Sequence, residues 1–356
     1  MQKLSAVLAL ALALALALPA AAASAVKETP IPDEEKLTAE IVQNALQAIE
    51  KSRAGGPARR DVHAKGHGCL KGTLTMAPGR PPSVRQGLFA KDGTYQIWSR
   101  FSNASGAMQS DSSPDARGAA LKLLGVPGAK LSASDPAGHN LDLLFFTEPV
   151  TPVRDAAGYA KIQKLAGGDR NALVYTAKHP AIIGTLLKAG LDGALVADPL
   201  EARYYSAAPY LLGAGAAKYH LKPCAPSHQL PATGADHLKT AMARHLAASP
   251  ACFELFAQLF VDEKSTPIED YSVEWTEAVS PLHAVATINF PKQTFDSPGQ
   301  GKFCEALSFD PWRTLAEHRP LGNLNRVRRA LYEAISKRRH ADNKTARAEP
   351  TGDERF

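Results

Sequence analysis

The middle of the chain is a succession of short strand-like segments separated by glycine and proline, and this pattern restricts the fold more than any other feature. It covers residues 60–145, where TYQIWSRFS (94–102) and GAALKLLG (118–125) have the composition of β-strands. Further candidate strands are RYYSAAPY (203–210), KYHLKP (218–223) and ATINFPKQ (286–293). No repeat and no long internal linker divides the sequence. It therefore predicts an α+β fold organised around one antiparallel sheet or barrel.

Helices are predicted before, between and after these strands. Residues 34–52 place apolar side chains every four residues, which is typical of an amphipathic helix, and Asp33 is its candidate N-cap. Residues 155–200 and 324–340 are also predicted to be helical. Ser249 and Pro250 have the order of an N-cap followed by a first helical residue, so a further helix is predicted there. Its core face would contain Phe253, Phe256, Leu259 and Phe260.

The first 25 residues have the pattern of a secretory signal peptide. Lys3 supplies a positive charge, residues 4–18 are almost entirely Leu, Ala and Val, and residues 20–25 offer small-residue cleavage sites. The alternative is a membrane anchor, for which an apolar run of about 15 residues is short. The sequence thus predicts a periplasmic or secreted protein with no stable membrane insertion after cleavage. Residues 26–340 would form the mature domain, and the polar, charged residues 341–356 a disordered tail.

Composition fits a soluble globular protein with a sizeable core, because 45% of the residues are hydrophobic and 21% are charged. The formal net charge is +6, and removal of Lys3 with the signal peptide leaves +5. Export argues against nucleic acid as the partner of this basic chain. The arginines are better suited to a small buried anion.

Four cysteines are present, namely Cys69, Cys224, Cys252 and Cys304. None are at C-x-x-C spacing, so neither a redox motif nor a zinc knuckle is indicated. An oxidising compartment permits disulfides in any of three pairings, and buried free thiols are also compatible with the sequence.

One face of the C-terminal helix combines a tyrosine with two cations. At 3.6 residues per turn, Arg328, Tyr332, Ile335 and Arg339 fall on nearly the same side. An ordinary amphipathic helix keeps its aromatic side chains on the apolar face. On the helix alone, a core tyrosine near solvated arginines remains the simpler interpretation.

Two segments upstream contain candidate polar site residues. In DVHAKGHGCLKG (61–72), His63 and His67 have the spacing of a helical metal pair, but Gly66 and Gly68 favour an extended or turning backbone. The alternatives are a zinc site made by both histidines with Cys69, or a single acid/base histidine, His63. In IWSRFSNASG (97–106), Arg100 lies inside a predicted strand. Either its stem lies on the surface or its guanidinium meets a buried anion.

Together, four ordered segments resemble the catalase family. They are HAKGHG, WSRFSNASG with DARGAALKLL, KFCEALSFDPWRTLAEHRPLGNLNR, and RRALY. The most specific part is SFDPW…EHRPLGNLNR followed by R-x-x-x-Y, and the resemblance covers about residues 30–340. The chain is shorter than a full-length catalase, and it looks most like the small exported heme proteins described as catalase-related peroxidases.

The resemblance implies a heme b enclosed by an antiparallel β-barrel with helices packed around it. Tyr332 falls at the family's proximal tyrosine, the iron ligand, and Arg328 at the arginine that hydrogen-bonds this phenolate. A phenol has a pKa near 10, so a neighbouring cation and ferric iron would help to keep it deprotonated. His63 matches the distal histidine, which moves a proton between the peroxide oxygens, and Ser102 matches the serine that hydrogen-bonds it.

The resemblance also assigns three arginines to the heme propionates: Arg60, Arg100 and Arg339. Three cations suit two buried carboxylates, since a buried unpaired charge is unfavourable.

The family's distal asparagine has two candidate positions in this chain. Alignment on Phe145–Phe146 places Asn140 there, whereas alignment on residues 153–155, which also matches Tyr159, places Thr147 there. The second alignment is preferred. With threonine at this position, peroxidase chemistry with an organic reductant is favoured over rapid peroxide disproportionation.

The sequence therefore predicts an exported heme b enzyme that reduces hydrogen peroxide or organic hydroperoxides with a small-molecule electron donor. A non-catalytic periplasmic heme-binding protein is one alternative. A lyase or isomerase acting on lipid hydroperoxides is another, and a homo-oligomer is compatible with each of them.

Overall fold

In the computed structural model, the structure is described for residues 26–53, 55–132, 138–165, 168–225 and 231–356. The predicted signal peptide, residues 1–25, lies outside this part of the chain. Within the described ranges, no helix has both the length and the apolar character needed to cross a bilayer.

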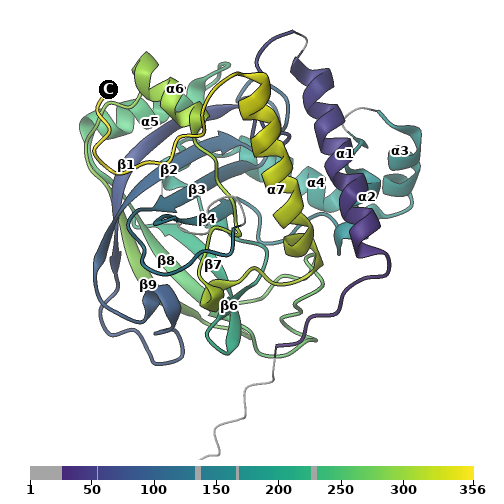
Figure 1. Cartoon of the computed structure of the whole chain (residues 1–356), viewed down its shortest axis with the longest axis horizontal. Coiled ribbons are helices and arrows are strands. Elements are labelled where there is room, and N and C mark those ends of the chain that lie inside the picture. Colours follow the sequence, from purple (N-terminus) through teal and green to yellow (C-terminus); the bar gives the residue numbers. More distant parts are fainter. Residues whose placement is uncertain (1–25, 54, 133–137, 166–167, 226–230) are drawn as a thin grey trace, which may run out of the picture.

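Nine strands form one antiparallel sheet that closes into a barrel (Figure 1). The strands are β1 (Gly66–Met76), β2 (Thr94–Asn103), β3 (Arg117–Leu123), β4 (Leu141–Phe146), β5 (Tyr204–Tyr205), β6 (Tyr210–Leu212), β7 (Gly215–Pro223), β8 (Ala251–Leu259) and β9 (Leu282–Phe290). Their order is β5-β4-β3-β2-β1-β9-β8-β7-β6, and pairing of β5 with β7 closes a ring of eight. β6 pairs with β7 outside the ring. The predicted α+β fold with an antiparallel barrel is confirmed.

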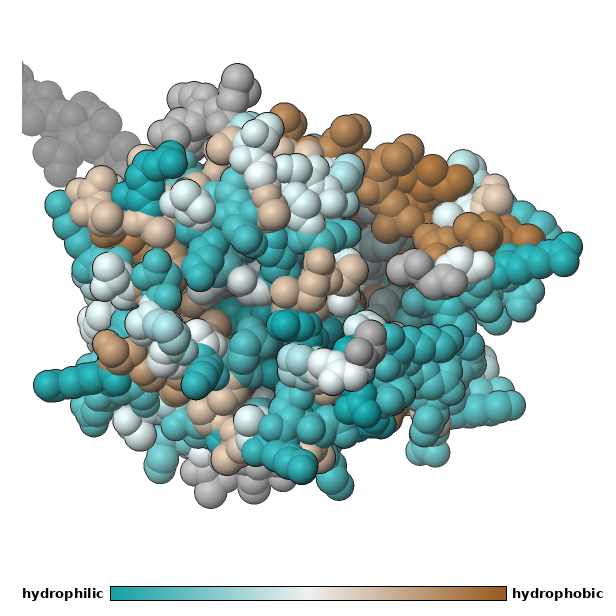
Figure 2. Space-filling view, turned by 90° about the horizontal axis from the view of Figure 1, so that it is seen from above, coloured by the Kyte–Doolittle hydropathy of each residue, from teal (hydrophilic) through white to brown (hydrophobic). Residues whose placement is uncertain are grey.

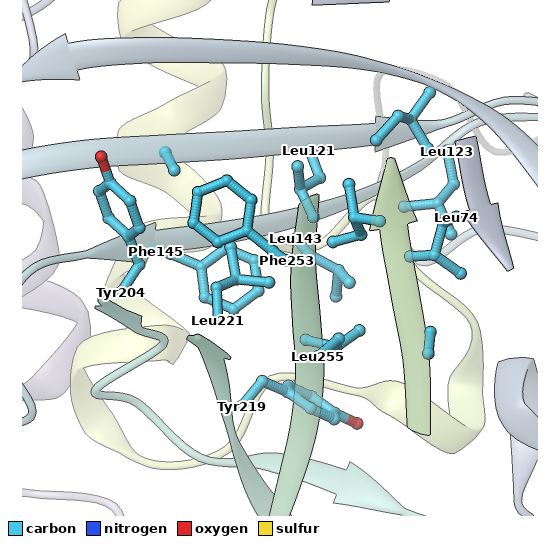
Figure 3. Packing of buried hydrophobic residues seen from close by; sticks show 14 of the residues in the cluster. Leu74, Leu121, Leu123, Leu143, Phe145, Tyr204, Tyr219, Leu221, Phe253 and Leu255 are labelled. Atoms are coloured by element: carbon cyan, nitrogen blue, oxygen red, sulfur yellow. The ribbon is translucent and has the colours of Figure 1, made fainter. Parts of the chain in front are cut away.

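The two faces of strands β2 to β4 have different roles. Phe101 on β2 pairs with Ala119 on β3, which pairs with Phe145 on β4, and all three are buried in the hydrophobic core. Figure 3 shows this core, in which large aliphatic and aromatic side chains from several strands meet. Successive side chains of a strand point to opposite faces. Arg100 and Ser102 therefore point away from the core, toward the predicted site.

Helices cover the outer side of the barrel. They are α1 (Glu34–Arg53), α2 (Ala156–Ile162), α3 (Arg170–Ala177), α4 (Pro180–Ala194), α5 (His237–Ala248), α6 (Pro298–Ala306) and α7 (Asn323–Asp342), with short 3₁₀ turns η1 (Gly87–Phe89), η3 (Pro199–Glu201) and η4 (Ala316–His318). α1 and α7 lie side by side (Figure 1), joined with α2 through a second apolar cluster. The helices predicted at 34–52, 155–200 and 324–340 are confirmed, the middle one as three separate helices.

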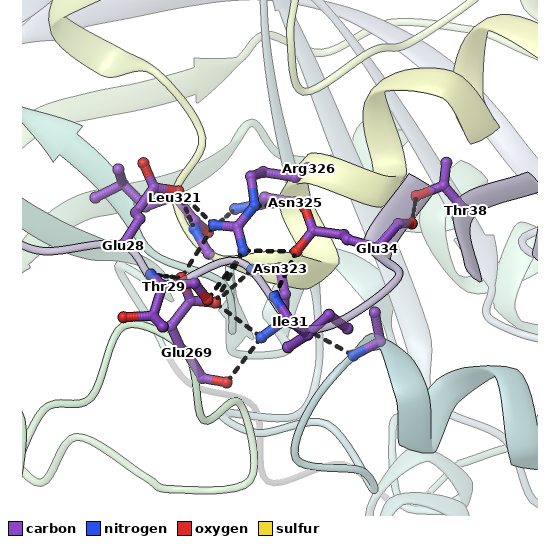
Figure 4. Close-up of polar contacts among 12 residues, drawn as sticks. Glu28, Thr29, Ile31, Glu34, Thr38, Glu269, Leu321, Asn323, Asn325 and Arg326 are labelled. Atoms are coloured by element: carbon purple, nitrogen blue, oxygen red, sulfur yellow. Dashed lines mark hydrogen bonds and ion pairs between the residues drawn. The ribbon is translucent and has the colours of Figure 1, made fainter. Parts of the chain in front are cut away.

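Arg326 holds the N-terminal segment against the start of α7. Its guanidinium contacts Glu28 Oε1 at 2.8 Å, Glu34 Oε1 at 2.7 Å and Glu269 Oε1 at 3.0 Å. In Figure 4 these carboxylates converge on Arg326 from two parts of the chain, the N-terminal segment with Glu28 and Glu34 and the loop with Glu269. Because the charges are only partly exposed, the network fixes the position of α7 more firmly than isolated surface pairs would.

All four cysteines form disulfides, which selects one of the three pairings. Cys69 is bonded to Cys304, and Cys224 to Cys252. The interpretation as free thiols is therefore wrong. Cys69–Cys304 fastens α6 to β1, and it spans 235 residues of sequence.

The helix predicted after Ser249 is wrong, because residues 251–259 form strand β8. Phe253, Leu255 and Ala257 are buried in alternation, while Glu254 is exposed. Aromatic residues three and four apart fit one face of a helix, but the same segment also satisfies a period of two. Pairing with β7 and β9 on both sides decides between the two patterns. The helix in this region is α5, which ends at Ala248.

The prediction of disorder for residues 341–356 is also wrong. α7 continues to Asp342, and the following segment packs across the outer surface near α6 (Figure 1). The Trp98 Nε1 donates to Glu354 Oε2 at 3.0 Å, and the Phe356 ring lies 5.2 Å from that of Phe303. Composition alone missed these contacts because Glu349 and Glu354 find partners, Lys122 and Trp98, that are remote in sequence.

The two disulfides should contribute unequally to stability. Loop-closure entropy predicts a loss of roughly 5 kcal/mol for Cys69→Ser with Cys304→Ser, and roughly 3.5 kcal/mol for Cys224→Ser with Cys252→Ser, because the first loop is longer. Denaturant unfolding of both double variants measures this difference. An equal loss, or a larger one for the shorter loop, would contradict the entropic origin.

Candidate active site

His63 lies in the turn before β1 and is held by the neighbouring strand. Its Nδ1 is 3.0 Å from the Asn103 carbonyl oxygen and 3.1 Å from Ser102 Oγ, so we assign the proton to Nδ1 and leave Nε2 as the base. Its backbone adopts φ 59°, in the left-handed region, which is strained for a non-glycine residue. Gly118 makes room for the ring, since a Cβ there would lie 2.4 Å from Nδ1.

The environment of His63 keeps its imidazole neutral. Burial, followed by the positive charge of Arg100, lowers the pKa of His63 from 6.5 to about 4. Arg328 and Arg60 act in the same direction from further away. The imidazole is therefore a proton acceptor at neutral pH. Because Arg328 belongs to the C-terminal helix α7, its effect on the pKa of His63 indicates that this turn lies near that helix.

The alternative zinc site is excluded by the structure. Cys69 has no free thiolate because it is bonded to Cys304. His67 is engaged elsewhere, with its Nε2 3.0 Å from Asn103 Oδ1. The described residues do contain one three-membered cluster of suitable ligands, Asp198, Glu201 and His245. It includes neither His63 nor His67.

On α7, Arg328 and Tyr332 form the pair expected from their spacing. Arg328 Nη2 donates to Tyr332 Oη at 3.0 Å, and Nη1 donates to Asn325 Oδ1 at 2.9 Å. Burial alone would lower the pKa of Arg328, but the oxygens of Tyr332 and Tyr210 beside it raise that pKa above its ordinary value. The interpretation of a core tyrosine near solvated arginines fails, since this arginine is directed at the phenol.

Sequence reasoning missed Asn325, which orients Arg328. Its side-chain Nδ2 donates to Pro209 O at 2.9 Å and Leu321 O at 3.0 Å, so its oxygen is fixed toward the guanidinium. The signal was present in the sequence. Asn325 lies three residues before Arg328, the spacing at which side chains meet on a helix.

The three arginines assigned to an anion do meet, and they surround a carboxylate that sequence reasoning missed. Arg60 Nη1 lies 2.9 Å from Glu305 Oε2, and Arg100 Nη2 lies 3.6 Å from Glu305 Oε1. Arg339 Nη2 donates to the Glu305 carbonyl oxygen. Burial would raise the pKa of Glu305, but Arg60, Arg100 and Arg339 together lower it to about 2. The surface position considered for Arg100 is wrong, because its side chain is only 4% exposed.

This arginine cluster has more positive charge than Glu305 neutralises. The Nε atoms of Arg100 and Arg339 are buried and have no hydrogen-bond partner in the described part of the chain. Burial, together with repulsion from Arg60, lowers the pKa of both Arg100 and Arg339 to about 9. Three guanidiniums around one carboxylate, two of them with unused donors, fit a ligand that brings further carboxylates.

The two candidates for the distal asparagine are separated by the length of β4. Asn140 precedes the strand, and its Nδ2 donates to Glu349 and to Pro350 O. Phe146, at the other end, pairs with Gly118 beside His63, roughly 20 Å away at about 3.3 Å per residue. Thr147 follows Phe146, and its Oγ1 accepts from the Arg117 amide at 3.0 Å. Neither candidate presents an amide to His63.

Tyr159 and Asp61 connect the two sides of the site. The carboxyl of Asp61 is buried, which raises its pKa to about 6. Burial raises the pKa of Tyr159 above its ordinary value, and the charges of Asp61 and Tyr332 add to this rise. The Tyr159 phenol is thus close to both the turn of His63 and the face of α7. His63, Ser102, Tyr332 and the arginine cluster converge on one region between the barrel and α7.

Comparison with known proteins supports the fold. No protein-family model matches the chain, and no curated protein does. Among solved structures, catalase A from Saccharomyces cerevisiae matches with a TM-score of 0.65 and 15% identity over 92% of this chain and 71% of its own. A fungal catalase matches with a TM-score of 0.61 and 16% identity, over 90% of this chain and 67% of its own. A bacterial catalase matches with a TM-score of 0.60 and 15% identity, over 90% and 63%. The chain has a catalase-like fold.

The lowered pKa of His63 predicts an acid-sensitive contribution to stability. Because the unfolded state binds the proton more readily, the free energy of unfolding falls as pH decreases from about 6.5 to about 4. In heme-free protein, His63→Gln should show a smaller fall than wild type over this range, measured by denaturant unfolding. His139→Gln, at an exposed histidine, is the matched control. An unchanged pH dependence in His63→Gln would contradict a neutral His63.

Proposed function

We propose that the chain is a heme b peroxidase that reduces hydrogen peroxide or organic hydroperoxides with electrons from a small-molecule donor. The observation that carries the proposal is the Arg328–Tyr332 pair, with its 3.0 Å hydrogen bond, in the same region as a neutral His63. The cluster of Arg60, Arg100 and Arg339 lies beside them and supplies positive charge for the two propionate carboxylates of a heme.

Tyr332 would be the iron ligand. Its oxygen accepts a hydrogen bond from the guanidinium of Arg328, which holds the phenol in place on α7. When bound, the heme supplies the iron that exchanges electrons with peroxide, and an anionic oxygen ligand favours its ferric state. Arg60, Arg100 and Arg339 would hold the propionates.

His63 would handle the proton. With Nδ1 occupied by Asn103 O and Ser102, Nε2 is the only ring atom available to accept a proton from the first peroxide oxygen. Returning it to the second oxygen makes that oxygen leave as water. Completion of the reaction needs two electrons and two protons, which yield a second water, and the external donor supplies the electrons.

Thr147 supports peroxidase rather than rapid catalase chemistry. Its hydroxyl accepts from a backbone amide, and it offers no amide donor to orient peroxide. Thr147 lines a pocket of about 280 Å³ that also contains Leu195 and Tyr205, which gives an organic substrate room near this end of β4.

An exported location agrees with the presence of two disulfides. Both disulfides join residues far apart in sequence, and such bonds persist in oxidising compartments. A periplasmic or secreted location, with removal of the leader, is therefore part of the proposal.

Substitution of the proposed iron ligand is the direct test. Tyr332→Phe should abolish the absorption bands of a tyrosinate-bound ferric heme and reduce peroxide-dependent dye oxidation by at least about a hundredfold, since it removes the ligand oxygen. Tyr175→Phe, on α3, is the control and should retain both. Wild-type protein that binds no added heme would overturn the proposal, and heme retained without peroxide turnover would favour a binding protein.

Glu305 should compete with the heme carboxylates for the arginine cluster. Glu305→Gln is expected to lower the stability of the heme-free protein by about 1 kcal/mol, a modest value because this side chain is 43% exposed. The same variant should bind heme several-fold more tightly, measured by titration of absorbance, because its arginines keep more positive charge for the propionates.

The dimethyl ester of heme, which has no free carboxylates, provides the control for Glu305. Its affinity should be the same in wild type and Glu305→Gln. A tighter ester complex in the variant would show that the effect of the substitution does not depend on the charge of the propionates.

A further inference from the structure

The outer face of α3 and α4 exposes an unusual number of large apolar side chains. Figure 2 shows hydrophobic residues gathered on the side of the molecule where these helices lie. The exposed residues are Leu173, Val174, Ile183, Leu186, Leu187, Leu191 and Leu195. Four of them, Ile183, Leu187, Leu191 and Leu195, recur every four residues, and we name these four the apolar stripe. The last three are 62%, 65% and 68% exposed.

The orientation of α4 is fixed by its glycines, so exposure of the apolar stripe follows from how the helix packs. A Cβ at Gly193 would lie 1.7 Å from the Asp115 carbonyl oxygen, and a Cβ at Gly190 would lie 3.1 Å from Pro114 Cβ. The helix therefore approaches residues 114–116 through its smallest side chains. A rotation that buried the leucines would bring larger side chains against this backbone and break the contact.

The same surface is rich in positive charge. From residue 161 to residue 188 the sequence contains five basic side chains and one acidic side chain, a net charge of +4 against +6 for the whole chain. The basic residues are Lys161, Lys164, Arg170, Lys178 and Lys188, and all of them are exposed. Within this stretch Asp169 is the one acidic residue, and its carboxylate caps α3. Lys188 is paired with Glu148 and with Asp192, so the positive charge of this surface comes from the other four basic residues.

We propose that this face docks on an anionic lipid surface. An apolar stripe on an amphipathic helix, flanked by lysine and arginine, can enter the headgroup region while the cations meet lipid phosphates. A two-fold contact with a second copy fits less well, because it would bring the same cations of both chains together. The protein would lie on the bilayer without spanning it, and Leu195 would bring the pocket containing Thr147 to the lipid.

Vesicle flotation tests the proposal independently of heme binding. The protein should begin at Val26, so that the apolar leader cannot itself bind lipid. It should bind vesicles of phosphatidylglycerol and phosphatidylcholine, bind phosphatidylcholine vesicles weakly, and lose affinity as salt screens the charges.

Two variants separate the apolar and the charged contributions. Leu187→Ser with Leu191→Ser should weaken binding by at least about tenfold, because two leucine side chains no longer enter the lipid. Lys164→Gln with Arg170→Gln and Lys178→Gln should also weaken it by at least about tenfold, and should abolish the salt dependence. Val261→Ser with Val279→Ser, each 44% exposed elsewhere, is the matched control and should bind as wild type does.

Three outcomes would overturn the proposal. They are failure to bind anionic vesicles, binding that the Leu187 and Leu191 changes do not weaken, and a solution dimer that these changes dissociate. The last would assign the surface to a second copy. Because heme affinity and vesicle affinity are measured separately, either proposal can fail while the other holds.

Discussion

The site depends on a concentration of buried positive charge that the chain only partly neutralises. Arg60, Arg100 and Arg339 approach one another from a loop, a strand and a helix, with Glu305 as the carboxylate between them. Burial, followed by repulsion from the neighbouring guanidinium of Arg60, lowers the pKa of Arg100 to about 9. The three guanidiniums stay close together only because the surrounding fold holds their side chains in place. The disulfide from Cys69 to Cys304, adjacent to Glu305, supplies a covalent part of that scaffold.

The same charge sets the chemistry of the neighbouring groups. Arg100 lies close enough to help keep His63 neutral, while its Nη2 donates to the His63 carbonyl at 3.0 Å and so holds the turn. One side chain thus holds the turn of His63 and helps to keep its imidazole neutral. On α7, Arg328 donates a hydrogen bond to Tyr332, and Asn325 orients Arg328. Arg326, two residues earlier, faces the other way and anchors the helix through three carboxylates.

Much of the fold was predictable because its periodicities are local. Helical spacing alone puts Arg328 and Tyr332 on one face of the helix, and the strands around Arg100 and Ala119 show their composition directly. The two errors arose where the local sequence pattern suggests one structure and contacts with distant residues produce another. Phe253, Phe256 and Phe260 fit a helix face, and only the neighbouring strands β7 and β9 make that segment a strand. The tail was predicted to be disordered because Glu354 and Phe356 find their partners far away in sequence.

The role of His63 in proton transfer was implied only by the resemblance to the catalase family, and it stays a prediction. By itself the sequence determined an α+β protein organised around an antiparallel sheet or barrel, and a tyrosine and an arginine on one face of the last helix, since both follow from neighbouring residues. It left open the cysteine pairing, the place of Asn140 and the surroundings of Arg100. Tertiary structure decided all three, because each depends on groups that closure of the barrel brings together. The contacts of Glu305 and the exposure of the apolar stripe were likewise decided by the tertiary structure. Whether Glu305 meets arginines, and whether the leucines of α4 face outward, depends on which side of each helix packs against the rest of the protein.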